Sequence, residues 1–340
     1  MTNSVSYHHL PLIDAELETF LQKHVRKGAA FNAEMARYHF STGGKRLRAL
    51  IPVWIFEACK ANIAPAVKLG AALEMVHNAT LVHDDLQDGD TVRRGKPTVW
   101  KKWSPAQAIN GGDAMFEFAV EILTEMEIDP RLLVRVIRRI SQGTLDVIEG
   151  QAQEFLMKDE PSPKLARYLE VIRGKTAALI ATSVGAATIA LGKNEETVGL
   201  AEDAAMQIGI LFQLQDDLLD LYGDKGRERV GGDIAEGKIS ALIAVFHDLA
   251  SEKDRKLVDE ILKKSRDLTT DADIQIVMNL LESSGAKKQV LGQVMEIQAA
   301  LNGHALGKKE PEILFLIQAL GQLFLKPIEN LLPGLGATRS

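Results

Sequence analysis

Helical spacing of hydrophobic positions runs through most of the chain. Apolar residues recur every three or four positions, as on one face of a helix, and no convincing run alternates apolar and polar residues as a strand would. The clearest stretch, residues 70–86, predicts a long helix with an apolar stripe at Leu73, Val76, Thr80 and Leu81. The pattern therefore predicts an all-α fold, a large helical bundle.

Proline, glycine and capping residues divide this pattern into elements. Pro105 opens one predicted helix, and Pro130 opens another that runs to about Met157. Asn194, followed by two glutamates, has the features of an N-cap, and its helix continues to about Tyr222. Four or five shorter helices follow. Loops are predicted at residues 89–97, 158–164 and 223–237.

The chain is expected to form a single domain spanning residues 1–340, with the first ~10 and last ~8 residues disordered. Residues 176–192 are the most membrane-like segment, but they fall short of the ~20 residues that a span needs and include Thr182 and Thr188. A buried helix is the better interpretation. Because residues 1–10 show no basic stretch followed by an apolar run, we expect no signal peptide and a cytoplasmic protein without a transmembrane segment.

Composition and charge exclude several classes of protein. Apolar residues make up 46% of the chain and charged residues 25%, as in ordinary globular proteins. A net charge of −6 argues against nucleic acid as a partner. The single cysteine, Cys59, rules out both an intramolecular disulfide and a cysteine metal cage.

Two segments share one spacing of aspartates, with two adjacent residues and a third four positions after the first. On a helix, residues four apart lie on the same face, so three carboxylates crowd into one turn. Both groups fall near a predicted helix C-terminus, where the dipole also disfavours negative charge. The first cluster is Asp84, Asp85 and Asp88, and the second is Asp216, Asp217 and Asp220.

A bound cation would relieve this repulsion. Magnesium is a hard ion that proteins hold through one or two carboxylates together with phosphate oxygens and water. One such cluster could be a solvated helix end, but two, each preceded by an apolar stripe, favour magnesium-diphosphate sites.

Basic residues occur in tight groups near glycine, as a diphosphate ligand would require. Arginine forks suit phosphate, lysine adds a point charge, and the Gly174 group should open a helix whose amides favour anions. His77, two turns before Asp84, is either a core histidine or a phosphate donor. Gln213 shares a helix face with Asp216. The basic groups are Lys45 and Arg48 after Gly43-Gly44, Arg93-Arg94 before Gly95, Lys175-Thr176 after Gly174, and Lys238 after Gly237.

These motifs resemble the trans-isoprenyl diphosphate synthases, in the order and spacing of that family from about residue 43 to residue 240. The resemblance implies an all-α homodimer with a central cavity. It also implies that isopentenyl diphosphate is condensed head-to-tail with an allylic diphosphate, giving an all-trans product. Trp100 departs from the pattern, because many relatives have histidine there.

The resemblance also implies roles for single residues. Three magnesium ions would have Asp84, Asp88 and Asp216 as direct ligands, with Asp85, Asp217 and Asp220 in support. The allylic diphosphate would be held by Arg93, Lys175, Thr176, Gln213 and Lys238. The isopentenyl diphosphate would be held by Lys45, Arg48, His77 and Arg94.

Product length should depend on the residues one turn before Asp84. Ala79 and Thr80 lie ~6–7.5 Å below the metals along the helix, where short-chain members of the family carry a bulky aromatic floor. Both residues are small, so we expect a product longer than fifteen carbons, with geranylgeranyl diphosphate favoured over a longer polyprenyl chain. Deeper residues such as Met115, Phe116 or Phe118 could set the limit.

Two other classes of protein share parts of this pattern. A class I terpene cyclase also has an aspartate-rich helix, but its second metal motif mixes other residue types and it needs no isopentenyl diphosphate. A non-catalytic partner subunit of a synthase usually lacks one aspartate motif, whereas both are complete here.

Overall fold

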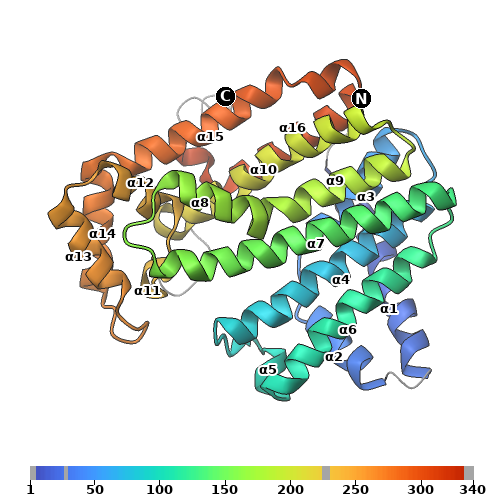
Figure 1. Ribbon diagram of the computed structural model, residues 1–340, viewed down its shortest axis with the longest axis horizontal. Helices are drawn as coiled ribbons and strands as arrows, with labels where there is room; N and C mark the ends of the chain where they lie inside the picture. The colour runs from blue at the N-terminus through green and yellow to red at the C-terminus, as the bar shows by residue number, and fades with distance from the viewer. Residues whose placement is uncertain (1–4, 27–29, 224–229, 333–340) are drawn as a thin grey trace. The chain divides into compact units, whose positions relative to one another are not determined.

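The computed structural model describes residues 5–26, 30–223 and 230–332. Almost all of its elements are helices, so the predicted all-α class is confirmed (Figure 1). The α-helices are α1 (Leu10–Arg26), α2 (Ala30–Phe40), α3 (Leu47–Ala58), α4 (Ala64–Gln87), α5 (Val99–Lys102), α6 (Pro105–Thr124), α7 (Pro130–Asp159), α8 (Leu165–Ile172), α9 (Ala178–Ala190), α10 (Glu195–Tyr222), α11 (Gly232–Ala235), α12 (Ala241–Leu249), α13 (Glu252–Leu262), α14 (Asp271–Ser284), α15 (Ala286–Asn302) and α16 (Pro311–Leu325). A π-helical turn, η2 (Arg173–Ala177), and three 3₁₀ turns, η1 (Tyr7–His9), η3 (Ala305–Lys308) and η4 (Lys326–Leu331), complete the helical elements.

Capping side chains start several of these helices where the sequence predicts. Ser104 precedes Pro105, and its hydroxyl accepts a hydrogen bond from the backbone N–H of Gln107 at 3.2 Å. Asn194 accepts from the backbone N–H of Thr197 at 2.9 Å and so caps α10. Each cap satisfies a backbone donor that the first helical turn leaves without a partner.

The chain divides into two compact units, each made of several stretches of sequence. The first unit is Met1–Leu145, Leu179–Glu202 and Lys309–Leu316. The second unit is Asp146–Ala178, Asp203–Lys308 and Ile317–Ser340.

In the first unit α4 is the central helix. It packs along α6, and also against α3 and α1 (Figure 1). The contact with α3 is close, because a Cβ atom at Gly70 would overlap the carbonyl oxygen of Ala49. The buried face of α4 includes Leu69, Leu73 and Met75. This packing fixes the helix that ends in the first aspartate cluster.

In the second unit the short helix α12 is enclosed by its neighbours. It packs against α8, α14 and α15, and Leu242, Ile243 and Phe246 are fully buried. Gly285, with φ +82°, ends α14 and starts α15 without a loop between them.

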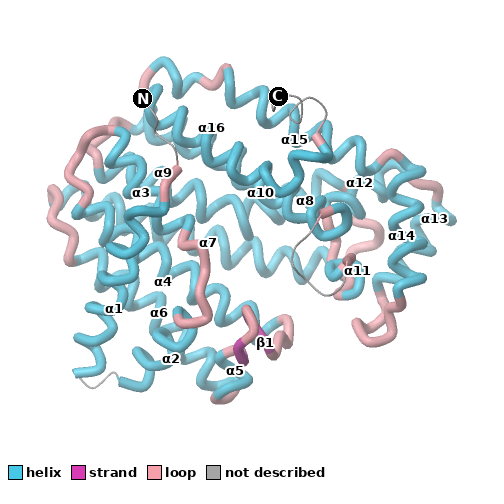
Figure 2. The backbone as a smooth tube through the Cα atoms, turned by 180° about the vertical axis from the view of Figure 1, so that it is seen from behind, coloured by secondary structure: helices cyan, strands magenta, loops and turns pink. Residues whose placement is uncertain are grey.

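The loop predicted at residues 89–97 contains a small hairpin that periodicity could not reveal. Strands β1 (Val92–Arg93) and β2 (Lys96–Pro97) pair antiparallel, with Arg93 opposite Lys96 (Figure 2). Arg94 and Gly95 have φ values of +50° and +77°, so both central residues of the turn are left-handed, as the tightest hairpins require. Two residues per strand are too few to show an alternating pattern.

Two further expectations need correction or restriction. Residues 7–9, expected to be disordered, form the turn η1. The loop predicted at 223–237 contains α11, while residues 224–229 lie outside the described residues, as do 333–340 at the C-terminus.

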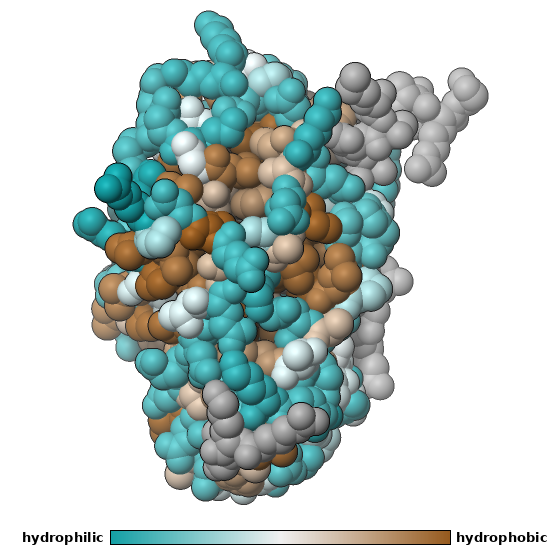
Figure 3. Space-filling model, turned by 90° about the vertical axis from the view of Figure 1, so that its right-hand side faces the viewer, coloured by the Kyte–Doolittle hydropathy of each residue, from teal (hydrophilic) through white to brown (hydrophobic). Residues whose placement is uncertain are grey.

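The segment judged most membrane-like is buried, as expected: α9 has no exposed residue. Among the described residues one segment, Pro311–Leu331, is long and apolar enough to cross a membrane by length and composition, and about half of it is buried inside the protein. Apolar residues also reach the surface in groups between polar ones on the face drawn in Figure 3.

Candidate active site

The first aspartate cluster lies at the C-terminal end of α4. Asp84 is in the last helical turn, and Asp88 is the cap residue, whose N–H donates to the carbonyl of Asp84 at 2.8 Å. Asp84 and Asp88 are partly exposed, whereas Asp85 is buried. Two accessible carboxylates one turn apart are a donor set that fits a magnesium ion.

The carboxylate of Asp85 is held from within the protein. The Nε and Nη2 atoms of Arg93 lie 2.7 and 2.6 Å from its Oδ1 atom. Burial raises the pKa of Asp85, and the Arg93 guanidinium opposes that rise. Arg93, predicted to hold the allylic diphosphate, is thus tied to the first cluster by an ion pair.

Trp100 fixes the end of the same helix. Its indole Nε1–H lies 3.0 Å from the carbonyl of Asp85 and 2.7 Å from that of Asp90. The Asp85 carbonyl lies in the last turn of α4 and also accepts from the backbone N–H of Asp90 at 2.9 Å, so the indole binds the end of α4 and the loop that follows it. The residue noted as a departure from the family pattern therefore anchors the cluster, a role that the sequence did not suggest.

Two basic groups that are far apart in the sequence meet beside this cluster. The guanidinium of Arg94 donates to the carbonyl of Gly43, and Lys96 Nζ donates to the carbonyl of Ser41 at 2.8 Å. Gly44 has φ +144°, a backbone conformation that favours glycine, and a Cβ atom there would lie 2.8 Å from the Arg94 guanidinium. The hairpin therefore lies against the loop that carries Lys45, which is exposed.

Arg48 and His77 form a pair within this basic region, with Arg48 Nη1 3.3 Å from His77 Nε2. Burial, together with the charges of Arg48 and Arg94, holds the pKa of His77 well below its ordinary value. The Nε atom of Arg48 is buried without a hydrogen-bond partner, and burial lowers the pKa of this guanidinium. Cations so placed favour a bound anion.

The adjacent Arg46 has a different environment from its neighbours Lys45 and Arg48. It is buried, with Nη1 3.1 Å from Glu74 Oε1 and Nε 3.3 Å from Asp14 Oδ1. Since its charge is compensated inside the protein, Arg46 acts in the structure of the first unit.

The second aspartate cluster lies near the end of α10, and its middle residue, Asp217, accepts hydrogen bonds from residues of α8, α10 and α12. Asp217 accepts hydrogen bonds from the Tyr168 hydroxyl, from Gln213 Nε2 at 3.0 Å, and from the backbone N–H of Ala241 at 2.7 Å. Burial raises the pKa of Asp217 to about 7. This carboxylate joins α8, α10 and the start of α12. Tyr168 was not anticipated, since nothing in its amphipathic helix marks it as a partner.

The other two carboxylates of this cluster differ in exposure. Asp220 is buried, and its Oδ2 accepts from the backbone N–H of Asp233 at 3.1 Å, which holds α11 to the end of α10. Asp216 is partly exposed, like Asp84 and Asp88 in the first cluster.

The prediction that Lys175 and Thr176 open a helix is wrong. Residues 173–177 form the π-helical turn η2, which continues α8 directly into α9, so no free helix N-terminus exists there. The helix start was inferred at the group that begins with Gly174, but this glycine allows close helix packing instead. A Cβ atom at Gly150 of α7 would overlap the backbone of Gly174 and Lys175. Single π turns are frequent at functional sites.

Three of the four predicted binding residues of the second unit belong to this turn or contact it. The Thr176 hydroxyl donates to Gln213 Oε1 at 2.8 Å, and Gln213 in turn donates to Asp217. Lys175 Nζ is paired with Glu154 of α7, a partner that the sequence analysis did not identify. Lys238 Nζ lies 2.8 Å from Glu236 Oε2.

The residues proposed to govern product length differ in exposure. Ala79 is fully buried, whereas Thr80 is partly exposed, and its hydroxyl donates to the carbonyl of His77 at 2.7 Å. Phe118 packs against Phe20 and His24 of α1, at ring distances of 5.7 and 4.7 Å. Phe118 is thus committed to the core between α1 and α6. Phe116 lies 5.9 Å from the ring of His83, and Met115 is buried.

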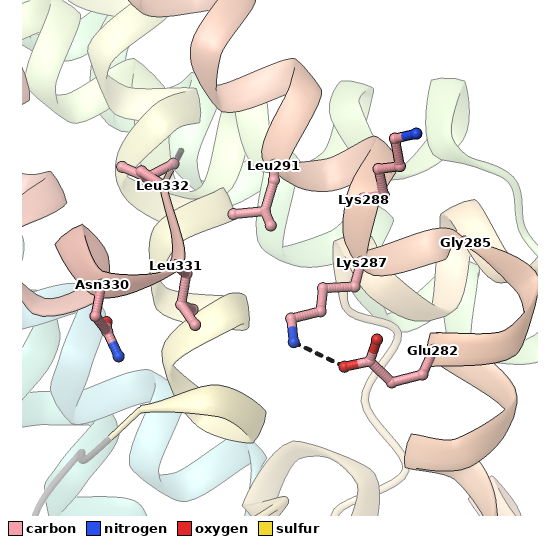
Figure 4. A pocket seen from close by; sticks show the side chains of 8 residues that line it. All are labelled: Glu282, Gly285, Lys287, Lys288, Leu291, Asn330, Leu331 and Leu332. Carbon is pink, nitrogen blue, oxygen red and sulfur yellow. Dashed lines mark hydrogen bonds and ion pairs between the residues drawn. The ribbon is translucent and has the colours of Figure 1, made fainter. Parts of the chain in front are cut away.

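A groove in the second unit can be set apart from this site. It lies between the start of α15 and η4, and an ion pair of 2.7 Å joins Lys287 to Glu282 within it (Figure 4). None of its lining residues belongs to the aspartate clusters or their basic partners.

Comparison with known proteins identifies relatives of this chain. The model of the polyprenyl synthetase family matches residues 30–281. A short chain isoprenyl diphosphate synthase of Methanocaldococcus jannaschii is 34% identical over 277 residues, which cover 81% of this chain and 82% of that protein.

Solved structures show the same fold. Geranylgeranyl pyrophosphate synthetase from Pyrococcus horikoshii superposes with a TM-score of 0.79 at 29% identity, covering 94% of this chain and 99% of that one. A polyprenyl synthase from Caulobacter crescentus, crystallised with calcium and isoprenyl diphosphate, gives a TM-score of 0.77 at 25% identity, covering 93% and 95% of the two chains.

Proposed function

Because this chain belongs to the polyprenyl synthetase family and is a prenyltransferase that elongates prenyl chains, we propose that it condenses isopentenyl diphosphate with an allylic diphosphate in a magnesium-dependent reaction. The observation that carries the proposal is that the two aspartate clusters share the same arrangement of exposed and buried carboxylates. In each cluster the second aspartate is buried and bonded by the protein, while the first is partly exposed.

We assign the magnesium ligands to the partly exposed carboxylates Asp84, Asp88 and Asp216, and expect three ions. Asp85, Asp217 and Asp220 hold the helix ends in place through Arg93, Tyr168 and the backbone N–H groups of Ala241 and Asp233. Magnesium bound to these ligands supplies positive charge that stabilises the departing diphosphate.

The basic groups divide between the two substrates. Lys45, Arg48, His77 and Arg94 form one group in the first unit, and we assign it to isopentenyl diphosphate. A neutral His77 can donate an N–H to a phosphate oxygen. We assign Arg93, Lys175, Thr176, Gln213 and Lys238 to the allylic diphosphate.

The chemistry follows from these assignments. Ionisation of the allylic carbon–oxygen bond leaves a carbocation, which the double bond of isopentenyl diphosphate attacks before a proton is lost. We expect the released diphosphate to take that proton. Cationic side chains hold both diphosphates in place, and an apolar pocket keeps water from the carbocation.

Replacement of Asp84 tests the proposal. In Asp84→Asn we expect the rate of product formation from isopentenyl diphosphate and an allylic primer to fall at least about a hundredfold, because a metal ligand is lost. The matched control is Asp113→Asn. Asp113 is an exposed residue of α6, and its Oδ1 atom lies 3.6 Å from Nε2 of His83, the residue that precedes Asp84 in the sequence. Equal rates in the two variants would contradict the metal assignment. A cyclised product from the allylic substrate alone would indicate a terpene cyclase instead.

We further propose a product longer than fifteen carbons, with geranylgeranyl diphosphate favoured over longer polyprenyl chains. The support is the small size of Ala79 and Thr80, together with the commitment of Phe118 to the core beside α1.

Enlarging these positions should shorten the product. With isopentenyl and farnesyl diphosphates as substrates, Ala79→Phe is expected to stop elongation earlier than the native protein, as measured by chromatographic sizing of the products. Because Ala79 is fully buried, Thr80→Phe at the partly exposed neighbour keeps the test valid if the first variant does not fold. Unchanged product length in both variants would show that the floor lies elsewhere.

We also propose that the protein is a homodimer in the cytoplasm. Helix α7 exposes four large apolar side chains, each about half or more accessible. At 100° per residue they fall within a stripe ~80° wide along the helix. Exposed Arg138 and Ser141 fall within the same stripe, so the apolar side chains are not continuous, but four of them on one helix face favour a protein interface. The four residues are Val134, Leu145, Ile148 and Leu156.

A further inference from the structure

The N-terminal turn η1 is attached to α3 by specific contacts. Trp54 of α3 donates its indole N–H to the carbonyl of Ser6 at 2.7 Å, and the ring of Tyr7 lies edge-on to Trp54 with 6.3 Å between centroids. Trp54 itself is buried. This attachment, in the first unit, brings the next two residues of the turn over the end of α3.

Those two residues are histidines that face one carboxylate. His8 Nε2 lies 3.6 Å from Glu57 Oε1, and His9 Nε2 lies 3.4 Å from Glu57 Oε2. The two imidazole rings are 3.7 Å apart between centroids. His9 Nε2 is also buried without a hydrogen-bond partner. None of these residues takes part in the proposed prenyl transfer.

The distances fit a shared metal ion better than hydrogen bonds. Two ligand atoms bound to one tetrahedral Zn²⁺ at ~2.0–2.1 Å lie ~3.3 Å apart. Both ring nitrogens stand near that distance from the carboxylate, beyond the usual length of a charge-assisted hydrogen bond, ~2.8 Å. By contrast, the single imidazole of His304 lies 3.0 Å from Asp203, as a hydrogen bond requires.

Ser6 orients the first imidazole. Its hydroxyl lies 2.8 Å from His8 Nδ1 and 3.4 Å from the backbone N–H of His8. When Nδ1 carries the proton and donates it to Ser6, Nε2 keeps the lone pair that a metal requires. A hydrogen bond at the other ring nitrogen is the usual support of a ligating histidine.

We propose that His8, His9 and Glu57 form a binding site for Zn²⁺ that fastens the N-terminal turn to α3. Two imidazoles and one carboxylate are a donor set that Zn²⁺ accepts, while Mg²⁺ prefers oxygen ligands alone. The side chains of His8 and Glu57 are about half exposed, so water has access to the fourth position.

Calorimetric titration of the full-length protein tests the site. The protein carries no polyhistidine tag, is stripped of metal with a chelator, and is kept in excess Mg²⁺ so that the aspartate clusters are occupied. The expected result is one equivalent of Zn²⁺ per chain, with affinity reduced more than about tenfold in His8→Ala and in His9→Ala. Zn²⁺ should also raise the melting temperature of the native protein by roughly 2–6 °C, but not that of the variants.

Copper provides an independent spectroscopic readout at the same site. The electron paramagnetic resonance spectrum of bound Cu²⁺ should show coupling to the nitrogens of two imidazoles, which a carboxylate site cannot give. That coupling should lose one nitrogen in His8→Ala, and added Zn²⁺ should remove the signal.

Matched variants separate this site from other metal-binding groups. His304→Ala, which removes an imidazole facing a single carboxylate, should bind Zn²⁺ as the native protein does. Glu57→Gln keeps the shape of the side chain and should weaken binding, which maintains the test if a histidine variant does not fold. The proposal is overturned if excess Mg²⁺ prevents all binding of Zn²⁺. It is also overturned if both histidine variants bind Zn²⁺ like the native protein. Prenyl transfer in Mg²⁺ should be unchanged in all these variants.

Discussion

Neighbouring aspartates in each cluster have different surroundings. Asp84 and Asp216 are partly exposed, whereas the adjacent Asp85 and Asp217 are buried among donors. The spacing of the clusters is visible in the sequence, and so is the shared face of residues four apart. The partners are not, because Arg93, Trp100 and Tyr168 reach the clusters from other elements and nothing in a helical pattern pairs a donor with a distant acceptor.

A buried histidine at the base of the basic region makes stability depend on pH. His39 of α2 is buried, and burial, with the charges of Arg93 and Arg94, lowers its pKa to about 3. The unfolded chain binds a proton at this residue below ~6.5, but the folded protein does not until pH ~3. The contribution of His39 to stability is therefore complete above pH ~6.5 and declines as the pH falls, by up to ~1.4 kcal/mol per pH unit.

Denaturant unfolding of the native protein and of His39→Gln between pH 7 and pH 4 measures this effect. Glutamine does not titrate, so the variant should lose less free energy of unfolding per pH unit than the native protein. Comparing slopes removes any constant cost of the substitution. Parallel curves for the two proteins would mean that His39 is protonated in the folded state.

At the scale of elements, one glycine determines how closely α3 and α4 approach. A Cβ at Gly70 would overlap the carbonyl oxygen of Ala49 and crowd the Ile13 side chain at 2.9 Å. Because backbone cannot move aside as a side chain can, Gly70→Ala should reduce the free energy of unfolding by about 1–3 kcal/mol. Thermal or denaturant unfolding measures the change.

Gly199→Ala is the control for that substitution. Gly199 is an exposed residue of α10 in the same unit, and its Cβ would meet no atom within 4 Å. Alanine is the better helix former, so this variant should be more stable by about 0.5–1 kcal/mol. If both variants changed stability in the same direction, the contact between α3 and α4 would not be as tight as described.

Helix boundaries show which elements a sequence can predict. The cap at Asn194 was predicted because its donor and acceptor are three residues apart, and the helix start at Pro105, which Ser104 caps, was predicted from the proline. The continuous helical connection from α8 to α9 was not predicted, because a glycine at position 174 is compatible with two different structures. It can end a helix, or it can admit a neighbouring helix, and only the packing of Gly150 against it decides between them.

At the scale of the whole molecule, the exposed stripe on α7 predicts the state of assembly. A buried leucine or isoleucine contributes ~1.5–3 kcal/mol to an interface, and a charge in its place adds a desolvation cost. In the double variant Leu145→Glu/Ile148→Glu, the dissociation constant of the dimer should rise at least about a hundredfold. Light scattering after size-exclusion chromatography should then give the mass of one chain.

The control for this variant is Leu268→Glu. Leu268 is as exposed as Leu145 but lies between α13 and α14. The Leu268→Glu variant should therefore remain a dimer. A native protein that elutes as a monomer, or a dimer that survives both changes on α7, would exclude this stripe as the interface.

The two compact units are interleaved along the chain, which passes from one to the other at residues 145/146, 178/179, 202/203, 308/309 and 316/317. Neither unit can be released by one proteolytic cut or encoded by one continuous gene fragment. A polypeptide ending at residue 145 would lack residues 179–202, which belong to the same compact body as the first aspartate cluster. Recombination between related genes at a single crossover would therefore join mismatched parts within both units, so the whole chain is the smallest piece that can be exchanged between relatives.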